Sequence, residues 1–119
     1  MSRLKLHRGM TNERWGAQPR TKRILMIANE LKRAGHCIGT GDAKALRECY
    51  DRGYELLSLE IPLARGTAGL KELLRFKEML GELYLAAPPA ASRNRAMLRA
   101  LLLLDAGAYN LAGGDAPAG

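Results

Sequence analysis

Apolar residues recur at helical spacing along most of this chain. The pattern predicts a first helix over residues 20–34, with an apolar face made of Ile24, Ile27, Ala28 and Leu31. Lys32 and Arg33 suit the last turn of such a helix, and Gly35 is expected to cap its C-terminus. A loop is then predicted over residues 36–41.

Two further helices follow from the same spacing. The second is predicted over residues 42–59, and Pro62 is expected to end it because proline has no N–H to donate. Its apolar face comprises Ala45, Leu46, Cys49, Tyr50, Leu56 and Leu57. The third is predicted over residues 67–86, closed by Pro88 and Pro89. Its inward residues are Leu70, Leu73, Leu74, Leu80, Leu83 and Tyr84.

A fourth helix is predicted over residues 93–112, with Ser92 as its N-cap. Its middle, residues 101–104, is leucine all round, which is typical of a helix buried on several sides. We therefore expect this helix to be central in the fold or to form the seam of an oligomer. Its buried residues should be Leu98, Leu101, Leu102, Leu104 and Ala108.

These elements predict an all-α fold, a compact bundle of four main helices with a basic N-terminal arm. The apolar residues are mostly Leu and Ala, and β-branched residues are scarce, which favours helix over sheet. The 119 residues suit one domain. We divide it into an arm over residues 1–19, a helical bundle over residues 20–112 and a flexible tail over residues 113–119.

Positive charge is concentrated at the front of the chain. Of the net charge of +7, the first 23 residues carry +6, because their only acid, Glu13, faces seven cations. These are Arg3, Lys5, Arg8, Arg14, Arg20, Lys22 and Arg23. The remaining residues are nearly neutral, so the front of the chain is the part expected to meet an anionic partner.

Two predicted helix starts carry cations where the helix macrodipole favours acids. The first has Arg20, Lys22 and Arg23, and the fourth has Arg93, Arg95 and Arg99. Free N–H groups together with several arginines suit a phosphate group. The alternative is that these side chains are merely long and solvated, since each misplaced charge costs only about 0.3–1 kcal/mol.

The single tryptophan, Trp15, lies in the predicted arm beside Arg14. It could stack on a nucleic-acid base or on a guanidinium. A buried ring that pins the arm to the bundle is the favoured interpretation, because burial is the common fate of so large an apolar group. Residues 11–15 could form one helical turn around it.

The sequence contains no pattern typical of catalysis or of metal binding. The two cysteines, Cys37 and Cys49, are too few for a disulfide framework and are expected to be reduced thiols in a cytoplasmic protein. No cofactor, metal site or catalytic residue is expected, and the chain is not expected to be an enzyme. The longest apolar run, residues 100–104, is far shorter than a membrane span, so no membrane partner is expected.

The favoured function is therefore a non-catalytic helical subunit that contacts a nucleic-acid backbone without sequence specificity, within a larger assembly. Lysine and arginine bind phosphates without any motif, and no base-reading helix is evident. The candidate nucleic-acid-binding residues are Arg3, Lys5, Arg8, Arg14, Arg20, Lys22, Arg23, Arg93, Arg95 and Arg99. The alternative is a protein-interaction bundle that dimerises through its leucine-rich face and docks an acidic protein on its arm.

Overall fold

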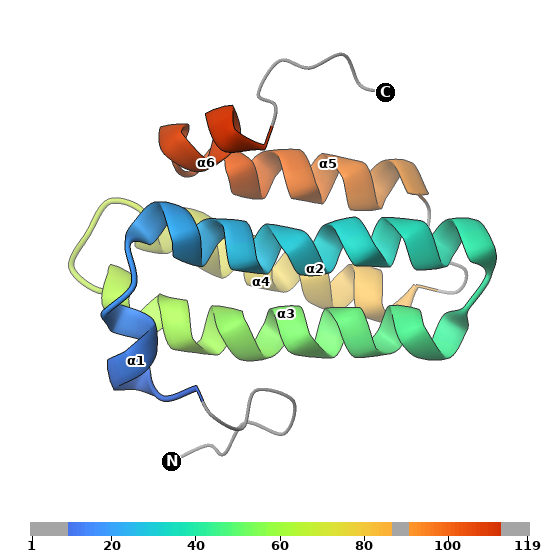
Figure 1. Ribbon diagram of the computed structural model, residues 1–119, viewed down its shortest axis with the longest axis horizontal. Coiled ribbons are helices and arrows are strands. Elements are labelled where there is room, and N and C mark those ends of the chain that lie inside the picture. The colour runs from blue at the N-terminus through green and yellow to red at the C-terminus, as the bar shows by residue number, and fades with distance from the viewer. Residues whose placement is uncertain (1–9, 87–90, 113–119) are drawn as a thin grey trace.

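Six helices make up the part of the chain that the structure, a computed structural model, describes, namely residues 10–86 and 91–112. No strand occurs in these residues, and four of the helices are long, so the expected all-α bundle of four main helices is confirmed (Figure 1). Expectations for the front of the arm, for Pro88 and Pro89 and for the tail fall outside the described residues. In chain order the helices are α1 (Asn12–Gly16), α2 (Arg20–Thr40), α3 (Ala43–Ala64), α4 (Leu70–Leu85), α5 (Ala91–Leu102) and α6 (Ala106–Leu111).

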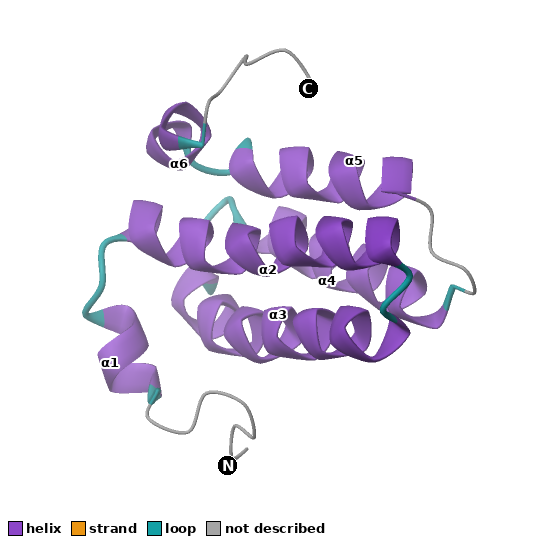
Figure 2. Ribbon diagram, turned by 45° about the vertical axis from the view of Figure 1, so that its right-hand side comes forward, coloured by secondary structure: helices purple, strands orange, loops and turns teal. Residues whose placement is uncertain are grey.

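The four long helices form a closed ring in which each packs on two neighbours. α2 packs on α3, α3 on α4, α4 on α5 and α5 on α2, and successive helices run in opposite directions (Figures 1 and 2). The two short helices lie outside the ring, where α1 contacts α3, and α6 contacts α2 and α5. Since all four long helices are equivalent members of this ring, the expectation that the fourth predicted helix is central is wrong.

The core fills the inside of the ring. Buried apolar side chains come from every long helix, and they include Ile24, Ile27, Leu31, Leu56, Leu57, Leu73, Phe76, Leu80, Leu83, Met97 and Leu101. Trp15 of α1 is also fully buried and joins this core, as the favoured interpretation of that residue predicts. The predicted boundary between arm and bundle falls between α1 and α2, and α1 itself packs on α3.

Gly35 lies inside α2 rather than at its C-terminus. The helix continues to Thr40, and its cap is Gly41, which adopts φ +76°. A Cβ at position 35 would lie 3.3 Å from the side-chain nitrogen of Asn94 on α5, so the glycine allows that side chain to approach the α2 backbone. The loop predicted over residues 36–41 is therefore wrong, because α2 runs through all but its last residue.

Pro62 also lies inside a helix, two residues before α3 ends at Ala64. Proline removes one N–H and its ring crowds the preceding turn, which disrupts the middle of a helix far more than its last turn. The helix therefore ends within one turn after the proline. The predicted end at residue 59 is too early for this reason.

The buried face of α4 is narrower than the sequence predicts. Its buried residues, Leu73, Phe76, Leu80 and Leu83, are three or four apart and form one stripe. Leu74 is one position, about 100° of rotation, away from this stripe and is 45% exposed, so the expectation that it faces inward is wrong. The helix also starts later than predicted, at Leu70, after a turn that contains Gly66 with φ +80°.

The predicted fourth helix is two helices, α5 and α6, with a break between Leu102 and Ala106. Asp105 causes α6 to start anew, because its carboxylate accepts a hydrogen bond from the Ala108 N–H at 2.9 Å as an N-cap. Ser92 lies within the first turn of α5 and is not its N-cap. Of the five residues expected to be buried here, Leu101, Leu102 and Ala108 are buried, and Leu98 and Leu104 are partly buried.

One polar side chain crosses the apolar core. Asn94 of α5 is 2% exposed, and its Nδ2 donates to the Leu31 carbonyl of α2 at 2.9 Å. Its Oδ1 accepts a hydrogen bond from the Tyr50 hydroxyl of α3 at 2.8 Å. The amide therefore joins three of the four long helices inside the ring.

Candidate nucleic-acid interface

The cationic residues expected to bind nucleic acid are spread over several elements. Three of the ten, Arg3, Lys5 and Arg8, lie outside the described residues. The other seven lie on three helices: Arg14 on α1, Arg20, Lys22 and Arg23 on α2, and Arg93, Arg95 and Arg99 on α5. Their surroundings differ enough to decide which of them a phosphate group could reach.

Arg20 and Lys22 lie exposed in the first turn of α2. The N-cap of this helix is Pro19, which offers no side-chain acceptor, and the first turn contains no acid. The Arg20 guanidinium reaches Gly69, since a Cβ there would lie 3.8 Å from its Nη2. Gly69 is the N-cap of α4, again without a side-chain cap, so two helix N-termini lie beside one exposed arginine.

Arg23 points inward and binds Glu60 of α3. Its Nε donates to Glu60 Oε1 at 2.8 Å, and its Nη1 donates to the Gln18 carbonyl at 2.7 Å. The side chain is only 13% exposed, and that of Glu60 is 4% exposed. Trp15 Nε1 donates to the same Glu60 oxygen at 2.9 Å. Arg23 therefore holds α1 and α2 against α3, and it is engaged there rather than turned toward a ligand.

The three cations of α5 have different neighbours. Arg93 lies 3.7 Å from Glu82 of α4, with both side chains largely exposed. Arg95 is exposed. Arg99 lies over the ring of Tyr109 on α6, with its guanidinium carbon 5.9 Å from the ring centroid. Each of the three therefore reaches solvent, and two of them are oriented by a neighbour.

The two arginine-rich helix starts lie at opposite ends of the bundle. α2 and α5 are antiparallel, because Asn94 meets Leu31 whereas the Asp105 carboxylate accepts a hydrogen bond from the Thr21 hydroxyl at 2.6 Å. The ten residues of α2 between Thr21 and Leu31 span about 15 Å. The predicted sites thus form two separate groups, and Arg99, near the end of α5, falls with the start of α2.

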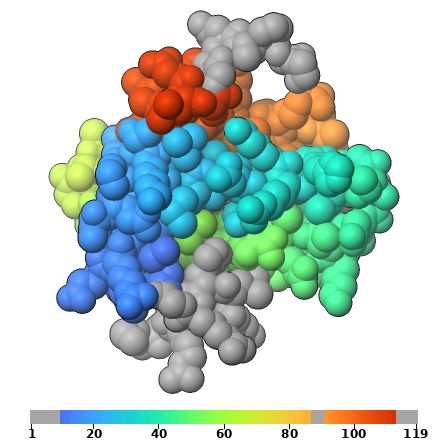
Figure 3. Space-filling view, viewed as in Figure 1, coloured from blue at the N-terminus to red at the C-terminus, as the bar shows by residue number. Residues whose placement is uncertain are grey.

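We define the α2-end surface as Arg20, Lys22 and Arg99, with Arg14 of the adjoining α1. In Figure 1, α1, the start of α2, the end of α5 and α6 all lie toward the same end of the molecule. Figure 3 shows α2 running along the surface of the molecule between α3 and the α5–α6 segment, with its outer side uncovered.

Asp105 lies within this surface and reduces its positive charge. The hydrogen bond from the Thr21 hydroxyl lowers the pKa of this carboxyl below its ordinary value, and the charges of Arg20 and Arg23 act in the same direction. The aspartate is therefore ionised at neutral pH. Sequence reasoning missed it, although an aspartate three residues before Ala108 is an ordinary N-cap signal.

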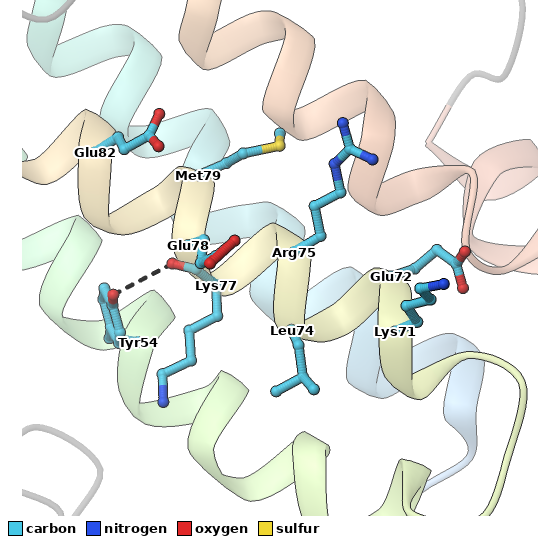
Figure 4. A pocket seen from close by; sticks show the side chains of 9 residues that line it. All are labelled: Tyr54, Lys71, Glu72, Leu74, Arg75, Lys77, Glu78, Met79 and Glu82. Atoms are coloured by element: carbon cyan, nitrogen blue, oxygen red, sulfur yellow. Dashed lines mark hydrogen bonds between the residues drawn. The ribbon is translucent and has the colours of Figure 1, made fainter.

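A shallow groove on α4 offers a contrasting surface (Figure 4). It is lined by three cations and three acids, together with Tyr54, Leu74 and Met79: the charged residues are Lys71, Arg75, Lys77, Glu72, Glu78 and Glu82. The Tyr54 hydroxyl donates to the Lys77 carbonyl at 3.2 Å across its edge. Because the charges balance, this groove does not favour an anion as the α2-end surface does.

Comparisons of the chain with protein-family models, with curated proteins and with solved structures find no significant match. Among residues 10–86 and 91–112, no three His, Cys, Asp or Glu side chains are grouped so that they could hold a metal ion. None of the helices described here has a stretch long and apolar enough to cross a bilayer.

Proposed function

We propose that this protein is a non-catalytic helical subunit that contacts the phosphate backbone of a nucleic acid through the α2-end surface. The observation that carries the proposal is the exposure of Arg20 and Lys22 at a helix N-terminus without a side-chain cap or a first-turn acid. Backbone N–H groups and long cationic side chains together favour a phosphate oxygen over water. Arg99 supports a further contact from the neighbouring helix end.

Sequence-independent binding is the form of contact that these residues favour. Readout of bases needs side chains held against base edges or exposed rings on which bases stack. The aromatic residues of the described chain are turned inward: Trp15, Tyr50 and Phe76 are buried, and Tyr54, Tyr84 and Tyr109 are partly buried. Phosphate contacts made by flexible cations are therefore the favoured mode.

The proposal predicts a steep dependence of binding on salt. Each phosphate neutralised on duplex DNA changes the slope of log K against log salt by about −0.9, so three contacts give a slope of about −2.7. We expect a dissociation constant of about 10⁻⁴–10⁻⁶ M at physiological salt, as is ordinary for non-specific binding. The measurement is fluorescence anisotropy of a labelled mixed-sequence duplex and of one of its strands over a salt series.

The structure changes which variants test the proposal. Arg23 is omitted, because its loss would break the contact with Glu60 and unfold this end of the molecule. The double variant R20A/K22A should make the duplex slope shallower by about 1.8. The control K32A/K44A removes the same charge from exposed positions on α2 and α3 near the other end, and it should change the slope much less.

The variant R93A/R95A asks whether the other end of the bundle also contacts the nucleic acid. A slope unchanged by this variant and reduced by R20A/K22A assigns the contact to the α2-end surface. Equal effects of R20A/K22A and of K32A/K44A mean that only net charge matters, and the proposed surface is then wrong. Absence of binding at low salt contradicts the nucleic-acid proposal as a whole.

The competing function, dimerisation through the leucine-rich face with an acidic protein on the arm, has less support. Leu101, Leu102 and Ala108 are covered within a single chain, so that face does not need a second copy. Light scattering with and without nucleic acid separates the two proposals, since a tight dimer that ignores nucleic acid favours the competing one. A cytoplasmic location remains part of our proposal, with partner subunits in a larger assembly.

A further inference from the structure

The thiols of Cys37 and Cys49 meet at the interface between α2 and α3. Cys49 is 3% exposed, whereas Cys37 is partly exposed at the edge of the core. The two thiols are within hydrogen-bonding contact of each other. The Arg52 guanidinium donates to Cys49 Sγ at 3.5 Å and to the buried Glu30 carboxylate at 3.0 Å. The pair is thus held by a fixed polar cluster that the proposed nucleic-acid contact does not use.

The backbones of α2 and α3 approach closely beside these thiols. A Cβ built on Gly53 of α3 would lie 3.9 Å from the Cβ of Glu30 on α2. A disulfide needs two Cβ atoms about 3.5–4.5 Å apart. The two helices therefore come as near to each other as a disulfide requires, within about one helical turn of Cys49.

The register of the two helices brings the cysteines to the same place. Glu30 faces Gly53, so four residues further along α2 and four residues back along α3, Ala34 faces Cys49. Ala34 is fully buried and has only a methyl group, which leaves room for the Cys49 side chain beside the next turn of α2. That turn carries Cys37.

We propose that Cys37 and Cys49 are a redox-responsive pair that closes a disulfide between α2 and α3 by exchange with a low-molecular-weight disulfide such as oxidised glutathione. Cys37 loses its proton to solvent, and its thiolate attacks one sulfur of the small disulfide. This step leaves a mixed disulfide on Cys37 and releases one glutathione thiolate. The protein thiols are oxidised in the full reaction, and the small disulfide is reduced to two thiols.

Cys49 completes the reaction from inside the protein. Its sulfur attacks the Cys37 sulfur of the mixed disulfide, the second glutathione leaves, and the proton of the Cys49 thiol ends on that leaving group. Burial raises the pKa of the Cys49 thiol, so this residue is protonated and shielded before the mixed disulfide forms. Cys37, which reaches solvent, is therefore the residue that reacts first.

The test uses the full chain, reduced and then incubated with excess oxidised glutathione under native conditions. Intact mass should fall by two hydrogen atoms, both free thiols should disappear, and proteolysis should release a peptide pair linked through Cys37 and Cys49. The oxidised chain should also unfold at a higher temperature than the reduced one, because the cross-link restricts the unfolded chain. Dithiothreitol should reverse every change.

Two variants separate this reaction from simple modification of an exposed thiol. C49A should stop at a stable glutathione adduct on Cys37, and C37A should stay unmodified while it is folded, as circular dichroism checks. A wild-type chain that stops at the adduct, keeps both thiols or links only to a second chain overturns the proposal. So does a C37A chain in which Cys49 takes up glutathione as fast as Cys37 does in C49A.

Discussion

The indole of Trp15 donates a hydrogen bond to Glu60, a carboxylate 45 residues further along the chain, at 2.9 Å. Arg23 binds the same carboxylate at 2.8 Å, so three helices, α1, α2 and α3, meet at one buried acid. The hydrogen bond and the ion pair together explain why a five-residue helix, too short to be stable alone, keeps its place on the bundle.

Replacing Glu60 with Ala should destabilise the protein by about 3–5 kcal/mol, because the partly buried Arg23 charge and the Trp15 N–H both lose their acceptor. Urea unfolding followed by circular dichroism measures the free energy of unfolding. Fluorescence of Trp15, the only tryptophan, reports whether α1 detaches first. The exposed control K32A should change stability by less than about 0.5 kcal/mol, and an E60A chain equally close to the wild type contradicts this account.

Acid should weaken the contact between Asp105 and Thr21. The folded protein lowers the pKa of Asp105, so the stabilisation is present above the ordinary carboxyl pKa of about 3.9 and is lost as pH falls through the lower folded-state value. D105N keeps an N-cap but removes the charge, and it should cost about 0.5–1.5 kcal/mol at pH 7. Urea unfolding between pH 7 and pH 3 should show this difference shrink; a constant difference argues against the charge.

Tyr50 should ionise late in an alkaline titration. Burial raises its pKa from 10.0 to about 12. Because the folded-state pKa is higher than the unfolded one, the stabilisation is complete below pH 10 and is lost as pH rises toward about 12. Absorbance of tyrosinate should show a late step that Y50F lacks, provided the protein is still folded by circular dichroism. A Y50F titration identical to that of the wild type would assign the step elsewhere.

Two nearby glycines should respond oppositely to alanine. Gly39 lies inside α2, and a Cβ at this position would have no atom within 4 Å, so G39A should stabilise the protein by about 0.5–1 kcal/mol. Gly41 has φ +76°, a conformation that alanine adopts only with strain, so G41A should destabilise it by about 1 kcal/mol or more. Thermal unfolding of the two variants provides the comparison, and a shift of the same sign in both would contradict the assignment of Gly41 as the cap.

The helices could be predicted from local spacing, and their ends only in part. A glycine after a basic turn has the same local pattern whether it caps a helix or gives a neighbouring helix room. Gly35 does the second, because Asn94 approaches it from α5. Only the packing of α5 on α2 distinguishes the two roles, and that packing joins residues about 60 apart. The end of α3 is equally hard to predict, since a proline such as Pro62 is tolerated in the last turn of a helix.

The candidate site shows the same limit. That Arg20 and Lys22 are exposed follows from their residue types, and the sequence predicts their shared position at the start of a helix. The role of Arg23 depends on Glu60, 37 residues away, which no local pattern could indicate. The burial of Asn94 is not predictable for a further reason, because this residue stands between two arginines in a segment whose charge suggests solvent.

Asn94 also bears on how the bundle avoids misaligned versions of itself. Leucines crowd the C-terminal part of α5, so sliding this helix by one turn would exchange one set of apolar contacts for another of similar area. The amide tolerates no such exchange, because only one alignment provides both the Leu31 carbonyl and the Tyr50 hydroxyl. Leucine at this position would preserve most of the burial and remove the selection, so the side chain supplies uniqueness of structure more than strength.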